Sequence, residues 1–151
     1  MTLAEARIGN SWKVQPTPTP TGVQGIVQGF LTGVSCTSVT ACSAAGDHFN
    51  DAGAQVPLME SWNGARWKIE SAPAARDSTT VSGISCPVAG VCAAAGVDSY
   101  VNQYATAGDG DSYTLVEAWN GKAWTIRSTP DLSGLLYNSL SITRQSPATT
   151  Q

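Results

Sequence analysis

The sequence predicts an all-β fold built from a repeated unit of four short antiparallel strands. Two sequence motifs indicate this fold, and each of them occurs twice in the chain. The first is Val-Ser-Cys or Ile-Ser-Cys, five residues and a second Cys, over 34–42 and 84–92. The second is Glu-x-Trp-Asn-Gly-x-x-Trp, over 60–67 and 117–124. Ser, Thr, Val and Trp favour extended structure, so a cysteine motif followed by a tryptophan motif indicates two consecutive hairpins.

The composition limits the classes of function. A chain of 151 residues suits one ordinary domain. Its formal net charge is −3 and its eight basic residues are scattered, which argues against nucleic-acid binding because phosphates need clustered Lys and Arg. No apolar run approaches the ~20 residues of a bilayer-spanning helix, so we expect no membrane span. Residues 1–7 lack the basic start and the apolar core of a signal peptide.

The chain begins with a degenerate copy of the second motif, which forms a partial unit over residues 1–15. This copy aligns with the end of the second complete unit without a gap: Leu3, Glu5, Gly9, Trp12 and Val14 fall on Leu115, Glu117, Gly121, Trp124 and Ile126. Arg7 replaces the first Trp of the motif. Residues 16–30 follow as a connector. Its alternate prolines cannot donate to a strand ladder, so we expect an extended surface segment.

The first complete unit covers residues 31–73 and begins with a cysteine hairpin. Cys36 and Cys42 can lie opposite each other on two strands, at a separation that a disulfide allows. Cys86 and Cys92 repeat this spacing. We expect two disulfides, each contributing roughly 2–2.5 kcal/mol in the chain-entropy model. Buried free thiols and a four-cysteine zinc site are the alternatives, although structural zinc usually needs closer ligand spacing.

A polar loop is expected over Asp47–Pro57, and it carries the only histidine, His48. The matching position of the second unit has no histidine. A lone histidine without a second His or Cys is a weak metal ligand and a weak base. We therefore interpret His48 as a solvated loop residue.

Each unit continues with a tryptophan hairpin. Asn-Gly supplies the positive φ angle that a tight turn needs, and a four-residue loop would place the two Trp side chains opposite each other. The residues with this structural role are Trp62, Trp67, Trp119, Trp124, Gly64 and Gly121. A stacking platform for sugars is the alternative use of the tryptophan pairs.

The second complete unit covers residues 81–130 and carries seven extra residues, including Gly-Asp-Gly-Asp-Ser over 108–112. The two aspartates resemble the start of a calcium loop. In an EF-hand register from Asp109, however, Thr114 stands where glycine is needed and Asn120 where a bidentate Glu belongs. We therefore expect a flexible hairpin loop, with no metal and no cofactor.

A third unit begins after Pro130 and is incomplete. It comprises a partial unit over 135–142, with one strand at Leu140–Ile142, and a polar tail over 143–151. Four antiparallel strands per unit suit a β-propeller blade, and the two terminal pieces would supply strands of one shared blade. A closed propeller needs about four or more blades. We therefore expect self-association, for example a dimer that closes the ring, or an incomplete piece with exposed edges.

The motifs also resemble a known family. Val-Ser-Cys, five residues, Cys, Ala-Ala-Gly, then Glu-x-Trp-Asn-Gly-x-x-Trp and a Thr-Pro connector resemble the repeats of large secreted actinobacterial proteins of the β-propeller-like kind. The resemblance covers most of residues 1–142, with departures at Arg7 and after Ile142. It implies export and a noncatalytic role, and it carries over no site residues.

Every recurring residue has a structural use, which leaves the variable loops for recognition. The sequence therefore predicts a noncatalytic extracellular binding module for a glycan or a protein, with its location inferred from the cysteine pairs although no signal peptide is present. One alternative is a sialidase-type propeller glycosidase. That chemistry needs an arginine cluster and paired acids, whereas Glu5, Glu60 and Glu117 recur as lattice positions. The other alternative is a truncated gene fragment without independent function.

Overall fold

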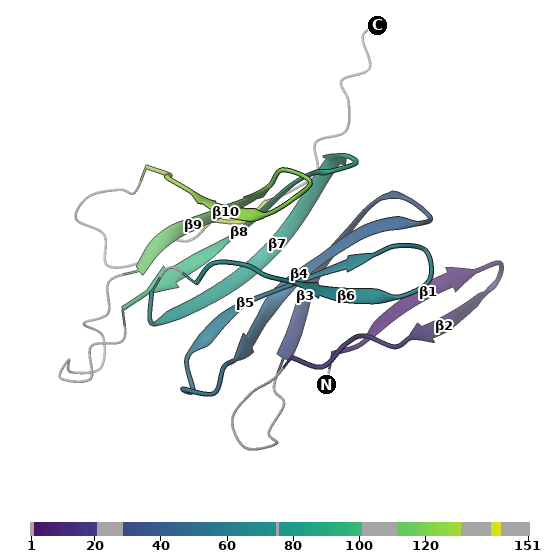
Figure 1. Cartoon of the computed structure of the whole chain (residues 1–151), viewed down its shortest axis with the longest axis horizontal. Helices are drawn as coiled ribbons and strands as arrows, with labels where there is room; N and C mark the ends of the chain where they lie inside the picture. Colours follow the sequence, from purple (N-terminus) through teal and green to yellow (C-terminus); the bar gives the residue numbers. More distant parts are fainter. Residues whose placement is uncertain (1, 21–28, 75, 101–111, 131–139, 143–151) are drawn as a thin grey trace, which may run out of the picture.

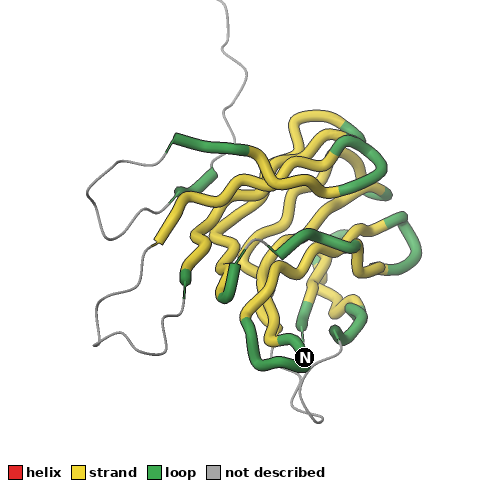
Figure 2. The backbone as a smooth tube through the Cα atoms, turned by 60° about the vertical axis from the view of Figure 1, so that its left-hand side comes forward, coloured by secondary structure: helices red, strands yellow, loops and turns green. Residues whose placement is uncertain are grey.

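The computed structural model describes residues 2–20, 29–74, 76–100, 112–130 and 140–142. The prediction of an all-β fold is confirmed, because these residues form strands, turns and loops and contain no helix (Figure 2). The strands are β1 (Ala4–Ile8), β2 (Ser11–Gln15), β3 (Gly29–Ser38), β4 (Ala41–Phe49), β5 (Gln55–Trp62), β6 (Trp67–Glu70), β7 (Ser78–Val88), β8 (Val91–Ser99), β9 (Ser112–Trp119) and β10 (Trp124–Arg127).

The strands form two antiparallel units of four and one separate ribbon. Unit 1 is β3–β4–β5–β6, unit 2 is β7–β8–β9–β10, and the N-terminal ribbon is β1–β2. One parallel pair, Gln55 with Ser78, joins the two units into a single sheet path. Ribbon, unit 1 and unit 2 follow one another along the molecule (Figure 1), and the described strands close into neither a ring nor a barrel.

The two units repeat each other at the level of single backbone contacts. The first hairpin of each unit contains a bulge, between Leu31 and Gly33 and again between Val81 and Gly83. Beside each bulge the partner strand carries a glycine, Gly46 or Gly96. A Cβ on Gly46 or Gly96 would lie 1.8 or 2.0 Å from a carbonyl oxygen across the hairpin. Only glycine allows this approach of the two backbones.

Both predicted disulfides are present, one in the first hairpin of each unit. Cys36 lies directly opposite Cys42 in the register of β3 and β4. Cys86 and Cys92 join β7 to β8 in the same way and are buried in the core, whereas Cys36 is exposed. The same covalent link therefore occurs in two environments.

The tryptophan hairpins have the predicted four-residue loops. Trp62 pairs with Trp67 and Trp119 with Trp124, with ring centroids 5.7 Å apart in both cases. In each loop the Asn side-chain oxygen accepts two backbone N–H groups. The following residues, Gly64 and Gly121, have φ angles of 92° and 87°. An L side chain rarely adopts this conformation, so Asn-Gly sets the turn.

The expected loop over Asp47–Pro57 is wrong. β4 continues to Phe49 and β5 begins at Gln55, so only residues 50–54 form a turn. His48 therefore lies half-buried on a strand, and Asp47 is buried and accepts a hydrogen bond from Gln55. Polar composition suggested a loop, but cross-strand pairing satisfies the backbone groups of these residues and extends the ladder.

The expectation of a surface connector after the ribbon is also wrong in part, because Thr17 and Pro20 are buried. The hydroxyl oxygens of Thr2 and Thr17 lie 2.6 Å apart, and Thr17 also donates to the Thr2 carbonyl oxygen. Thr114 and Thr129 make the same pair of contacts, again with 2.6 Å between hydroxyl oxygens. The ribbon and its connector thus repeat the geometry around β9 and β10, as the gap-free alignment predicts.

Each sheet has two faces, which we name for unit 1 by the side chains of β5. The front face carries Leu58, Glu60 and Trp67, and the back face carries Ala45 and Met59. In unit 2 the front face carries Leu115, Glu117 and Trp124, and the back face carries Ala95 and Val116. The core joins Ala45 and Met59 to Ala94 and Trp124, so the back of unit 1 packs on the front of unit 2.

The front face of unit 1 is covered by the N-terminal ribbon. Trp67 donates its indole N–H to the Gln15 side-chain oxygen at 3.1 Å. Leu3 and Ala4 of the ribbon line a common cavity with Ala44 and Trp67. Ribbon, unit 1 and unit 2 therefore stack in one direction, each back face on the next front face.

Candidate functional site

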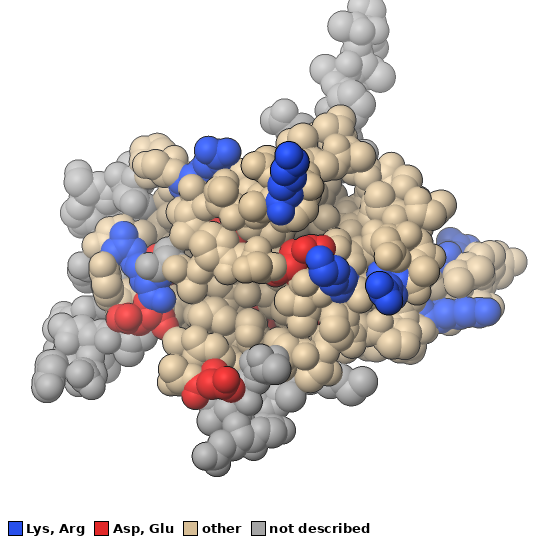
Figure 3. Space-filling view, in the orientation of Figure 1, with Lys and Arg blue, Asp and Glu red and all other residues tan. Residues whose placement is uncertain are grey.

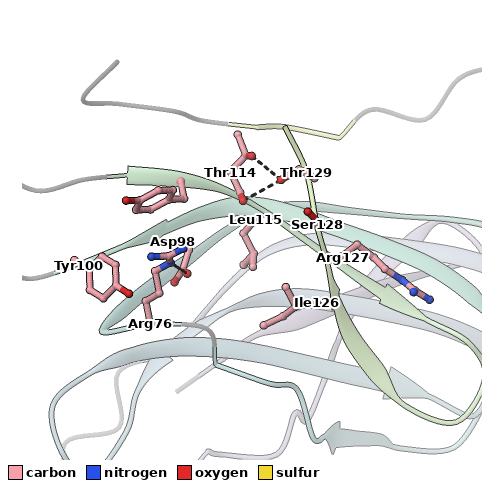
Figure 4. Close-up of a pocket in the computed structure, with 10 residues that line it drawn as sticks. Arg76, Asp98, Tyr100, Thr114, Leu115, Ile126, Arg127, Ser128 and Thr129 are labelled. Carbon is pink, nitrogen blue, oxygen red and sulfur yellow. Dashed lines mark hydrogen bonds and ion pairs between the residues drawn. The ribbon is translucent and has the colours of Figure 1, made fainter. Parts of the chain in front are cut away.

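A cavity of about 350 Å³ lies at one end of unit 2 (Figure 4). Its walls come from the segment before β7, from the ends of β8 and β9, and from β10 with the residues that follow it. The lining residues are Arg76, Asp98, Tyr100, Tyr113, Thr114, Leu115, Ile126, Arg127, Ser128 and Thr129.

Arg76 is the centre of the polar wall. Its guanidinium carbon lies 3.9 Å from the ring centroid of Tyr113 and 4.6 Å from that of Tyr100. The two rings meet edge to face, with centroids 6.2 Å apart. Cation–π contacts of this kind contribute about 0.5–2 kcal/mol each, more when the cation is partly desolvated. The two tyrosines therefore hold the arginine in a fixed orientation.

Asp98 fixes the other side of the arginine. Its Oδ2 lies 3.0 Å from Nε of Arg76, and its Oδ1 accepts a hydrogen bond from the Thr79 hydroxyl at 2.9 Å. Burial raises the pKa of Asp98, while the Thr79 hydrogen bond and the Arg76 charge act in the opposite direction. The pair is a buried positioning contact, since the Asp98 side chain is almost inaccessible.

The rest of the cavity is apolar or neutral. Leu115 and Ile126 point toward each other across the floor of the cavity (Figure 4). The hydrogen-bonded pair of Thr114 and Thr129, which we call a threonine clasp, forms the upper rim. The Arg127 guanidinium points away from Arg76 in the same view. The wall thus offers aromatic rings, one oriented cation and two hydroxyls around an apolar floor. These groups can bind a ligand by stacking and by hydrogen bonds.

Two buried glutamates lie outside this cavity, at the boundaries between the stacked elements. Glu60 and Glu117 are 1% and 0% exposed, and their carboxylate oxygens have no hydrogen-bond partner among the described residues. Desolvation raises the pKa of Glu60 to about 7, with a smaller opposing effect of the nearby Thr2 hydroxyl, which lies outside hydrogen-bonding geometry. Desolvation and the charge of Asp98 raise the pKa of Glu117 to about 7. Glu5, at the same position of the ribbon, is exposed.

The residues singled out by the sequence do not line this cavity. The four cysteines and the paired tryptophans lie in the hairpins, where Trp67 and Trp124 are buried. The candidate calcium loop lies outside the described residues except for Ser112. Among the described residues, no three His, Cys, Asp or Glu side chains gather to hold a metal ion.

Sequence reasoning missed the cavity because its defining residues are not repeated. By the alignment of the two units, Asp98, Tyr100 and Tyr113 correspond to His48, Asn50 and Val56. The signal that could have found them is this difference between two otherwise similar copies. No local motif marks Arg76, which precedes the repeat.

Comparison of the chain with known protein families, curated proteins and solved structures gave no match. Within its described part the chain has no helix that could cross a lipid bilayer. The basic side chains are spread singly over the face drawn in Figure 3.

Proposed function

We propose that the chain is a noncatalytic extracellular binding module that recognises a glycan in the cavity of unit 2. The observation that carries this proposal is the Arg76 guanidinium held between Tyr100 and Tyr113 beside an apolar floor. An oriented cation and aromatic rings recognise a saccharide through its hydroxyl or carboxylate groups and its apolar ring face.

The division between repeated and unrepeated residues supports a binding role. The repeated residues close turns, form disulfides or fill the core, and so they serve the scaffold. The charged and aromatic wall of the cavity is formed where the copies differ, by Arg76, Asp98 and the two tyrosines, whereas its floor and rim are repeated positions. Such differing segments at strand ends are where binding sites commonly lie on a rigid β scaffold.

The position of the acidic groups supports a noncatalytic role. Glycoside hydrolysis needs two carboxyl groups that flank the scissile bond. Glu60 and Glu117 have the raised pKa of a general acid, but both are sealed between packed elements. Asp98, the acidic residue that lines the cavity, is engaged by Arg76 and Thr79.

Two further features support the location and the architecture in this proposal. The two disulfides are compatible with an extracellular location, because such bonds persist in oxidising compartments. Stacked four-stranded antiparallel units, each with its back on the next front, support an array of propeller-like blades.

A glycan array followed by calorimetry tests the proposal. We expect the wild-type chain to bind a defined set of glycans. Tyr100→Ala should weaken binding about tenfold or more, the effect of losing one stacking contact. Tyr100 suits the test because its half-exposed side chain can be truncated without opening the core. Arg66→Ala, an exposed basic residue in the hairpin of unit 1, is the control and should bind like the wild type.

Three results would contradict the proposal. They are the absence of glycan binding at high concentration, equal effects of the two substitutions, and capture of a protein ligand alone. Turnover of a fluorogenic sialoside by the same preparation would instead support the glycosidase alternative.

A further inference from the structure

One face of the N-terminal ribbon carries Glu5, Trp12 and Val14, and we call it the front face of the ribbon because it corresponds to the front faces of the two units. This face is exposed, whereas the front faces of both units are buried. Trp12 corresponds to Trp67 and Trp124 by sequence and by register, since each is the tryptophan of the second strand of its hairpin. Trp12 is 67% exposed, whereas Trp67 and Trp124 are 8% and 6% exposed. The ribbon therefore presents a residue that the fold buries wherever it recurs.

The neighbours of Trp12 on this face follow the same pattern. Leu3 lies at the edge of this face, where it also lines the cavity beside Trp67, and it is 60% exposed, whereas its counterparts Leu58 and Leu115 are 1% and 3% exposed. Glu5 and Val14 lie opposite each other on the same face and are exposed as well. Large apolar residues clustered on one exposed face mark an interaction surface rather than ordinary surface composition.

The structure shows what covers this face where it is buried. The front face of unit 2 is covered by the back face of unit 1, through Ala45 and Met59. The front face of unit 1 is covered by the back of the ribbon, through Gln15. The complement of an exposed front face is therefore the back face of another unit.

Unit 2 presents such a back face. Val116 occupies the position of Met59 and is only half-buried, whereas Met59 is almost inaccessible. Residues 140–142 cover part of this back face. A Cβ on Gly33 would lie 3.5 Å from the Ile84 side chain of unit 2, and one on Gly83 would lie 3.6 Å from the Ile142 side chain.

The expected strand at Leu140–Ile142 is not formed, because residues 140–142 pair with no other strand. Ile142 nevertheless packs on unit 2 as Ile84 packs on unit 1, in the place that the first strand of a following unit would take. The outer pair of strands of that unit has its counterpart in the ribbon, whose Thr2–Thr17 clasp repeats the Thr114–Thr129 clasp of unit 2. Within one copy the two pieces lie at opposite ends of the stack, on unit 1 and on unit 2.

We propose that copies of this chain associate head to tail, with the front face of the ribbon of one copy on the back face of unit 2 of another. The ribbon of the first copy and residues 140–142 of the second would then both lie on the back face of unit 2 of the second copy. Such a heterologous interface can close into a ring. This inference is tested apart from glycan binding, because neither Trp12 nor Val116 lines the cavity of unit 2.

Sedimentation velocity over a range of concentrations tests the inference. We expect the wild-type chain to exceed its monomer mass of 15.6 kDa as the concentration rises. Trp12→Glu should raise the dissociation constant about 30-fold or more, as expected for a buried tryptophan at an interface. Val116→Arg should have a similar effect from the opposite face. Val39→Glu, at a turn position that is 91% exposed, is the control and should associate like the wild type.

A mixing experiment distinguishes head-to-tail contact from a symmetric one. Trp12→Glu retains an intact unit 2 back face, and Val116→Arg retains an intact ribbon front face. An equimolar mixture should therefore recover a dimer that neither variant forms alone. Thermal unfolding of each variant by circular dichroism shows whether it is folded. A monomeric wild-type chain, a dimer that Trp12→Glu leaves unchanged, or folded variants that fail to complement each other would overturn the inference.

Discussion

Glu60 and Glu117 hold the same position in the two units, and both carboxyl groups are removed from water without a hydrogen-bond partner among the described residues. Burial of an unpaired carboxylate is costly, so the folded chain favours the protonated form. The pKa of each group rises from 4.5 to about 7. Between these two pH values the folded chain binds more protons than the unfolded chain. The free energy of unfolding should therefore fall as the pH rises from about 4.5 to about 7.

The first prediction is that Glu117→Gln removes one part of this pH dependence. A full shift corresponds to a stability difference on the order of 3 kcal/mol across the window. Urea unfolding from pH 4.5 to 8 should show the wild-type chain losing stability relative to the variant as the pH rises. Glu5→Gln is the matched control, because Glu5 has the same sequence position on an exposed surface.

Two other titrating groups have perturbed pKa values, but both remain in the variant. The pKa of Asp98 is raised mainly by burial, so its contribution has the same sign as that of the glutamates. The pKa of His48 is lowered by desolvation, so its contribution decreases stability as the pH falls below 6.5. The difference between wild type and Glu117→Gln reports the titration of Glu117 together with its coupling to Asp98. Parallel stability curves would show that Glu117 titrates normally.

At the scale of the elements, the two disulfide hairpins are identical in spacing and different in surroundings. The bond of unit 1 lies at the surface, with Cys36 exposed. The bond of unit 2 lies in the core between the units, where the backbone N–H of Cys86 donates to the Ser35 hydroxyl at 2.9 Å. The unit 2 disulfide therefore contributes packing and a contact between units as well as chain closure.

The second prediction is that replacing Cys86 and Cys92 by Ala costs more stability than replacing Cys36 and Cys42. Each pair should lose about 2 kcal/mol of loop-closure stabilisation. The buried pair should lose about 1–2 kcal/mol more, because its sulfur atoms fill part of the core. Chemical denaturation of the two double variants measures the difference. Equal losses would mean that core packing around Cys86 and Cys92 contributes little.

The elements also show which parts of the fold could be predicted. Cysteine spacing and Asn-Gly predicted the hairpins, because a short disulfide loop and a positive φ angle each restrict the local geometry strongly. The extent of β4 and β5 was missed, since Asp47 and His48 are polar and their pairing partners are distant in the sequence. The cavity was missed for a related reason. Arg76, Tyr100 and Tyr113 meet only through tertiary packing.

At the scale of the whole molecule, the units stack in one direction. The back face of unit 1 is covered by unit 2, whereas the back face of unit 2 is less completely covered. Hydrogen bonds across the boundary support the covered face: the Thr32 hydroxyl donates to the Val81 carbonyl oxygen at 2.7 Å. The equivalent positions Met59 and Val116 therefore test the stack. They occupy the same register on two copies of one sheet, and only their surroundings differ.

The third prediction is that Met59→Ala costs about 2–5 kcal/mol of unfolding free energy, the usual range for a fully buried methionine. Val116→Ala should cost under about 1.5 kcal/mol, because a half-buried valine loses fewer contacts. Both variants are compared by urea unfolding at a low concentration, at which copies of the chain remain apart. Met59→Ala should also shift the tryptophan emission of the folded chain to the red, because Met59 packs in the cluster that contains Trp124. Similar costs at the two positions would mean that the back face of unit 2 is covered as completely as that of unit 1 within a single copy. In that case the surface available for head-to-tail association would be smaller than the stack implies.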